Sequence, residues 1–171
     1  MVIWITGLSA SGKTTLCQTI YARLKPRLPE LVMVDGDQVR ALFGGDLGHT
    51  EQDRVVQIKR VQSLTVMLES QGLVVLVAAL YAHPDLLAWN RATFSNYVEV
   101  YLEASIDLVR QRDPRGLYAR YDANQTLDVV GLDIPWRPPV APDLTFDVAT
   151  ASAEDLASRL ITAIPRLARA A

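Results

Sequence analysis

Gly7-Leu8-Ser9-Ala10-Ser11-Gly12-Lys13-Thr14, close to the start of the chain, is the stretch that decides the fold. It matches the phosphate-binding pattern G-x-x-x-x-G-K-[ST] without a gap. The apolar run at residues 2–5 predicts a buried strand before it, and Leu16, Ile20 and Leu24 predict one face of a helix after it. In a strand–loop–helix unit of this kind, successive backbone N–H groups and the helix N-terminus hold one phosphate group.

The loop predicts a nucleotide site with divided roles. Lys13 is expected to reach the β- and γ-phosphates of ATP, and the Thr14 hydroxyl is placed to ligate Mg²⁺. The nucleotide-binding residues predicted from the loop are Gly7, Leu8, Ser9, Ala10, Ser11, Gly12, Lys13, Thr14 and Thr15.

Composition narrows the class of partner. The 171 residues are half apolar and carry a formal net charge of −2, which argues against nucleic-acid binding and favours small nucleotides. We expect a single domain over residues 1–171. The longest apolar run, residues 73–81, is too short to cross a bilayer, and a strand beginning at residue 2 leaves no room for a signal peptide. With a single cysteine, Cys17, the chain is expected to be a reduced cytoplasmic protein without membrane contact.

The order of elements predicts an α/β fold, a P-loop NTPase-type parallel sheet with helices on both faces and a lid segment. Strands are expected at residues 2–5, 31–34, 73–78, 97–102 and 144–148. Helices are expected at residues 38–43, 51–69, 84–94 and 153–170, besides the one after the phosphate loop and one that ends near residue 112. Residues 113–142 read as irregular, and a long irregular connection in a compact domain is a functional lid or is disordered. We expect the lid at about residues 112–137.

Two carboxylates follow the second predicted strand. Asp35 and Asp37 lie at the strand's carboxyl end, where open α/β sheets bind their ligands. Asp35 would hold the water shell of Mg²⁺, and Asp37 would accept a proton from an attacking hydroxyl. The alternative is a plain Asp-Gly-Asp turn.

Other residues favour a small-molecule kinase over an ATPase or GTPase. The third predicted strand ends in Ala78-Ala79 without a carboxylate, and no Asn-Lys-x-Asp segment is present. Arginines gather around Arg40, Arg54 and Arg112; singly they fit solvated charges, and together they fit anion recognition. His49 and His83 lack metal-ligand spacing and are expected to be ordinary polar residues.

Five blocks together resemble the adenylylsulfate kinase family. They are the phosphate loop, Asp35-Gly36-Asp37-Gln38-Val39-Arg40, Asp53-Arg54, Arg112-Asp113-Pro114-Arg115-Gly116-Leu117-Tyr118 and Gly131-Leu132-Asp133-Ile134-Pro135. The resemblance implies transfer of the ATP γ-phosphoryl group to the 3′-hydroxyl of a nucleotide's ribose, with Mg²⁺, as in sulfate assimilation. It implies Asp37 as the base, with Asp35 and Lys13 beside it, and Arg112 and Arg115 near ATP. It also implies an acceptor site made by Asp37, Arg40, Arg54, Gln57, Arg60 and Val129, and it leaves a homodimer open.

The chain departs from the family pattern on the acceptor side. The family usually has Asn at Gln57, Arg at Lys59, Phe-Thr at Val129-Val130, Tyr-Glu at Trp136-Arg137 and Ser-x-Ile at Ala79-Leu80-Tyr81. The family's phenylalanine is expected to stack on the acceptor base, which valine cannot do. Adenylylsulfate is therefore the leading acceptor, and another modified nucleotide such as the cytidine diphosphoramidate of capsule pathways is the alternative. A nucleotide-binding regulator without turnover is a third hypothesis, against which the intact Lys13, Thr14, Asp35 and Asp37 argue.

Overall fold

A computed structural model describes all 171 residues and has one five-stranded sheet. The strands are β1 (Val2–Thr6), β2 (Leu31–Asp35), β3 (Val74–Ala78), β4 (Tyr97–Glu103) and β5 (Leu144–Asp147). Their order is β2-β3-β1-β4-β5, and every neighbouring pair is parallel. The predicted α/β class is therefore confirmed, with β1 at the centre of the sheet and β3 beside it.

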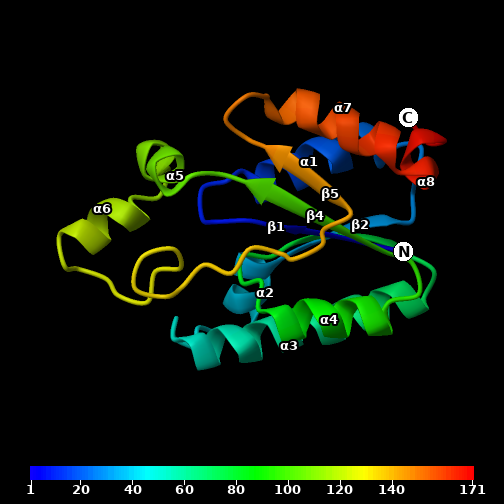
Figure 1. Cartoon of the computed structure of the whole chain (residues 1–171). Helices are drawn as coiled ribbons and strands as arrows, with labels where there is room; N and C mark the ends of the chain where they lie inside the picture. Colours follow the sequence, from blue (N-terminus) through cyan, green and yellow to red (C-terminus); the bar gives the residue numbers. More distant parts are fainter.

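Helices cover both faces of this sheet (Figure 1). On one face lie α1 (Lys13–Leu24), α7 (Ala153–Ala163) and α8 (Pro165–Ala168). On the other lie α2 (Gly36–Leu42), α3 (Glu51–Ser70) and α4 (Pro84–Thr93). The short helices α5 (Ile106–Arg112) and α6 (Leu117–Asp122) stand beyond the carboxyl end of β4, and α6 lies within the segment expected to be the lid.

Side chains of β1 point alternately to the two faces of the sheet and contribute to the apolar core on each face. Ile3 and Ile5 are fully buried against α1 and α7, whereas Val2 and Trp4 are fully buried on the side of α3 and α4. Since successive side chains of a strand point to opposite faces, a strand covered on both sides needs an unbroken apolar run. The run at residues 2–5 therefore marks the strand from which the phosphate loop leaves.

Two stretches differ from the predicted elements. Residues 117–122 form α6 inside the segment expected to be irregular, because Asp113 accepts hydrogen bonds from the N–H groups of Leu117 (2.7 Å) and Ala119 (3.0 Å) and so caps the helix. The terminal helix is not continuous over residues 153–170, because Pro165 cannot continue α7 and begins α8 instead.

Helix α3 ends as predicted, with Gly72 just beyond it. Gly72 has a φ of 83°, and its N–H donates to the Glu69 carbonyl while the Leu73 N–H donates to the Leu68 carbonyl. This left-handed ending suits glycine and returns the chain directly into β3.

The carboxyl ends of the strands define one edge of the molecule. The phosphate loop follows β1, Asp35 ends β2, and the lid folds back from α5 and α6 over the same edge (Figure 1). Ligands of open α/β sheets bind at this edge.

Candidate functional site

The phosphate loop is shaped by its two glycines. A Cβ at Gly7 would lie 2.6 Å from the Leu102 carbonyl oxygen, so only glycine fits against β4 there. Gly12 precedes α1 with a φ of 98°, and no side chain caps this helix. The Ser11 hydroxyl oxygen is buried without a hydrogen-bond partner. Uncapped N–H groups and an unpartnered hydroxyl together make a site that a phosphate group would satisfy.

Lys13 lies inside this loop. Its Nζ donates to the carbonyl oxygens of Gly7 (2.9 Å) and Leu8 (2.7 Å). Burial lowers the pKa of Lys13 to about 8, and the nearby Asp37 and Asp35 oppose that shift. Through these two carbonyls, Gly7 and Leu8 hold the ammonium group even though neither residue lines a cavity.

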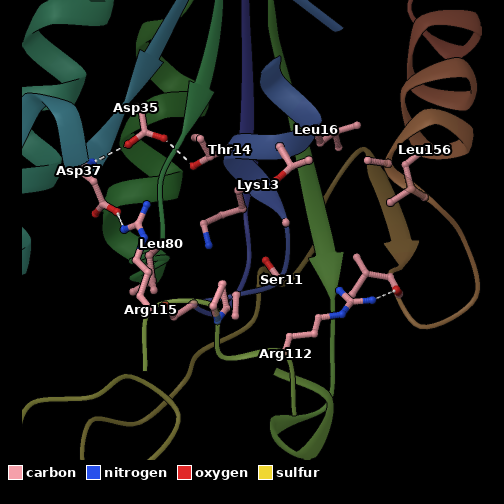
Figure 2. Close-up of a pocket in the computed structure, with 18 of the residues that line it drawn as sticks. Ser11, Lys13, Thr14, Leu16, Asp35, Asp37, Leu80, Arg112, Arg115 and Leu156 are labelled. Atoms are coloured by element: carbon pink, nitrogen blue, oxygen red, sulfur yellow. Dashed lines mark hydrogen bonds and ion pairs between the residues drawn. The ribbon is translucent and has the colours of Figure 1, made fainter. Parts of the chain in front are cut away.

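Thr14 and Asp35 face each other across the first turn of α1 (Figure 2). The Thr14 hydroxyl donates to Asp35 Oδ2 over 2.6 Å, and Asp35 Oδ1 accepts from the N–H of Asp37 (2.8 Å) and caps α2. A hydroxyl and a carboxylate are the ligand types that Mg²⁺ prefers. No group of three His, Cys, Asp or Glu side chains is placed to hold a metal ion. Thr14 and Asp35 together would suit a Mg²⁺ that also takes phosphate oxygens.

A cavity of about 540 Å³, here called the donor cavity, opens over the phosphate loop. It runs from Lys13 and Thr14 past Arg112 to the segment that follows β5. Arg112 Nη2 donates to the Val148 carbonyl over 2.6 Å, and Leu156 of α7 closes the apolar end (Figure 2). Of the predicted nucleotide-binding residues, Ser9, Ala10, Ser11, Gly12, Lys13, Thr14, Thr15, Arg112 and Arg115 line it.

A second cavity of about 260 Å³, here called the acceptor cavity, adjoins the first. The two share a wall that includes Asp37 and Arg115, whose side chains form an ion pair and are both largely exposed (Figure 2). Hydrogen bonding to Asp37 raises the pKa of Arg115 further. The predicted base therefore lies at the junction of the two cavities.

Two arginines that line the acceptor cavity form no ion pair. Arg40 donates to the carbonyl oxygens of Leu47 and Gly48, and Arg54 donates to those of His49 (2.9 Å) and Asp128 (2.6 Å). Neither has a carboxylate within ion-pair distance. Burial, and then the nearby Arg40, lowers the pKa of Arg54. Paired guanidinium groups without counter-charges are suited to an anionic ligand.

Gln57 brings an unused acceptor atom to the same cavity. Its side-chain amide donates to the Gly36 carbonyl over 2.9 Å, while Oε1 is buried without a partner. A buried polar atom without a hydrogen bond is costly, so this oxygen has the capacity to accept one further hydrogen bond.

Two residues predicted for the acceptor site lie elsewhere. Arg60 is paired with Asp46 at 2.5 Å and lies over the Phe43 ring at 4.4 Å, outside both cavities. Val129 and Val130 are both 2% exposed and pack in the core on the α3 side, and of the two only Val130 lines the acceptor cavity.

Several lining residues were missed by the sequence analysis. Val148 follows β5 directly, and Tyr81, which the sequence analysis named only as a departure from the family pattern, lies three residues after the end of β3. Their place near the carboxyl ends of strands was a usable signal. His49 and Asp128 reach the acceptor cavity because of how the connections fold, for which the sequence has no signal. Arg120, which also lines it, belongs to the arginines near Arg112 that the sequence analysis associated with anion recognition. Burial, Arg40 and Arg54 lower the pKa of His49, which the sequence analysis treated as an ordinary polar residue.

A parallel sheet, a phosphate loop with Lys13 and Thr14, and a second cavity beside the first define a P-loop kinase that acts on a small molecule. The adenylylsulphate kinase family profile matches residues 1–147. The chain belongs to this family. Its phosphoryl donor is ATP with Mg²⁺, and its acceptor is a hydroxyl group of a nucleotide.

Relatives match over most of their length. The chain is 39% identical to the adenylyl-sulfate kinase of Pseudomonas entomophila over 150 residues, covering 86% of this chain and 72% of that protein. It is 32% identical to that of Chloroflexus aurantiacus over 98% of this chain and 90% of that one. The structure of the Mycobacterium tuberculosis APS kinase CysC in complex with AMPPNP and APS superposes with a TM-score of 0.86, at 28% identity, covering 94% of this chain and 95% of that one. None of the helices combines the length and apolar character needed to span a membrane.

Proposed function

We propose that this kinase transfers the γ-phosphoryl group of ATP to the ribose 3′-hydroxyl of adenylylsulfate. The observation that carries the proposal is the position of Asp37 in the wall shared by the donor and acceptor cavities. A proton-accepting carboxylate at that junction can reach a hydroxyl that enters from one side and attacks a phosphate held on the other. The family and its named relatives support adenylylsulfate as the acceptor.

On the donor side, the loop binds the triphosphate. The uncapped start of α1, the Ser11 hydroxyl and the Lys13 ammonium group meet the β- and γ-phosphates, and Thr14 with Asp35 would hold Mg²⁺. Bound Mg²⁺ supplies neutralisation of the charge on the phosphate oxygens. The adenine base takes the apolar end of the cavity, between Arg112 and Leu156.

On the acceptor side, different residues bind the charged part and the hydrogen-bonding part of the ligand. Arg40 and Arg54 hold the anionic phosphosulfate, since both lack carboxylate partners. The unpartnered Oε1 of Gln57 accepts a hydrogen bond from an amino or hydroxyl group of the acceptor. Of the residues predicted for the acceptor site, this assignment retains Arg40, Arg54 and Gln57. It does not include Arg60 and Val129.

Asp37 and Arg115 together control the reaction. The phosphates of ATP compete with Asp37 for the Arg115 guanidinium. When Arg115 pairs with the phosphates instead, the Asp37 carboxylate is free to accept the proton of the 3′-hydroxyl. Because the phosphoryl transition state has little covalent chemistry to assist, Lys13 and Arg115 act by stabilising charge. Arg115 belongs to the predicted lid at about residues 112–137, so closure would also exclude water and limit ATP hydrolysis.

We place the reaction in the cytoplasm, where ATP is supplied. That residues 1–171 are one domain and that the chain forms a homodimer both stay predictions. Sedimentation analysis of the pure protein tests the second.

An acceptor panel tests the proposed function. Purified protein with Mg²⁺ and ATP is given adenylylsulfate, cytidine diphosphoramidate or no acceptor, and ADP release is followed. Saturable turnover with adenylylsulfate alone is expected. Turnover with cytidine diphosphoramidate alone would refute adenylylsulfate as the substrate. ATP binding without turnover of either acceptor would support the hypothesis of a nucleotide-binding regulator.

A further inference from the structure

A three-residue contact ties the lid to the acceptor cavity from outside the predicted site. Glu51 is the first residue of α3, and its Oε1 accepts a hydrogen bond from the Tyr81 hydroxyl (3.0 Å) and another from Arg137 Nη1 (3.0 Å). The three residues come from the start of α3, the connection after β3 and the end of the lid. Two of them, Tyr81 and Arg137, are positions at which the chain departs from the family pattern, and Glu51 joins them.

Each of these segments also shapes the acceptor cavity. Tyr81 is 5% exposed and is one of the residues that line it. Arg54 lies one turn after Glu51 on α3 and donates to the Asp128 carbonyl in the lid. The start of α3 and the lid are therefore joined twice, once through Arg54 and once through Arg137.

The charges of the contact keep it formed at neutral pH. Hydrogen bonds from Tyr81 and then Arg137 lower the pKa of Glu51, so its carboxylate stays ionised. Burial and the bond to Glu51 raise the pKa of Tyr81, so its hydroxyl stays a donor. The Glu51 and Arg137 side chains are 45% and 40% exposed, and an ion pair that exposed contributes little to stability.

We propose that Glu51, Tyr81 and Arg137 form a latch that positions the lid and the first turns of α3 for binding of the acceptor. The three are positioning residues, because they act through Arg54 and the cavity wall and not on the reacting atoms. The inference rests on the proposed function, since it takes the second cavity as the acceptor site. Its prediction is a specific loss of acceptor affinity, with binding of ATP in the neighbouring cavity preserved.

Steady-state kinetics of single variants test the latch. Arg137→Ala and Tyr81→Phe should raise KM for adenylylsulfate at least about fivefold, with KM for ATP and kcat changed less than about twofold, because only acceptor positioning is lost. Arg137→Lys keeps a cation and should restore most of the affinity. Arg166→Ala is the matched control, since Arg166 pairs with Glu30 at 2.9 Å with similar exposure, 43% and 37%, far from either cavity.

Hydrogen exchange separates failure of the latch from failure of the proposed function. In the free protein, Arg137→Ala should speed exchange at residues 126–137 and at the start of α3, and Arg166→Ala should not. If the wild-type protein does not phosphorylate adenylylsulfate, the proposed substrate is refuted. The exchange result would still decide whether the latch exists. Unchanged exchange together with an unchanged KM in Arg137→Ala would overturn the latch. An equal rise of both KM values would also overturn it, because that pattern is a general structural defect.

Discussion

The efficiency with which the enzyme uses ATP should depend strongly on pH, because Lys13 changes its protonation state. Burial lowers the pKa of this lysine to about 8, and the loop carbonyls of Gly7 and Leu8 are its hydrogen-bond partners. A lysine is charged below its pKa and neutral above it, so the cation that meets the phosphates is lost as pH rises. With a pKa near 8, the protonated fraction falls from about nine-tenths at pH 7 to about one-tenth at pH 9. Since kcat/KM for ATP reports the enzyme before ATP binds, it should fall about tenfold over that range.

The assay is a pH profile of kcat/KM for ATP from pH 6.5 to 9.5 at saturating acceptor. Burial raises the pKa of Cys17 far above this range and that of Tyr118 to about 12, so neither this thiol nor this phenol titrates there. Lys13→Arg is the control, since a guanidinium stays charged and its profile should be flat even if its activity is lower. A flat wild-type profile, or the same decline in Lys13→Arg, would refute the reasoning.

Three further substitutions test the assigned residues. Asp37→Asn should lower kcat by ~10²–10⁴-fold with KM for ATP nearly unchanged, as expected for loss of a positioned base, and a loss under about tenfold would contradict that role. Arg54→Ala should raise KM for the acceptor by about 10–100-fold, the effect of one charged hydrogen bond, whereas Arg60→Ala should change it less than about twofold; equal effects would return Arg60 to the site. Val129→Phe should destabilise the protein by about 1–3 kcal/mol in denaturant unfolding, because it overpacks a core position, and tighter acceptor binding without loss of stability would show that Val129 faces the ligand.

Periodicity and turn chemistry predicted the frame of the molecule. An unbroken apolar run gave β1 and the phosphate loop that follows it, because a strand buried on both faces has no polar positions. The same reasoning misplaced the end of α7, although Pro165 was a readable stop. It also missed α6, whose cap comes from Asp113, four residues before the first helical residue.

The acceptor side could be predicted less well because it depends on contacts between distant segments. Arg60 was placed in the site on sequence resemblance, but Asp46 and Phe43 hold it outside. Val130 lines the acceptor cavity and the neighbouring Val129 does not, a difference for which the residue pattern has no signal. The contact of Glu51 with Tyr81 and Arg137 joins positions 30 and 86 residues apart.

The most direct test of the central claim is the position of the transferred phosphate. Wild-type protein is incubated with Mg²⁺, ATP and adenylylsulfate, and the product is examined by ³¹P NMR with proton coupling. The account predicts one new phosphorus resonance coupled to the ribose H3′ proton, formed in equal amount to ADP. A resonance coupled to H2′, or release of inorganic phosphate from ATP without a phosphorylated nucleotide, would contradict it.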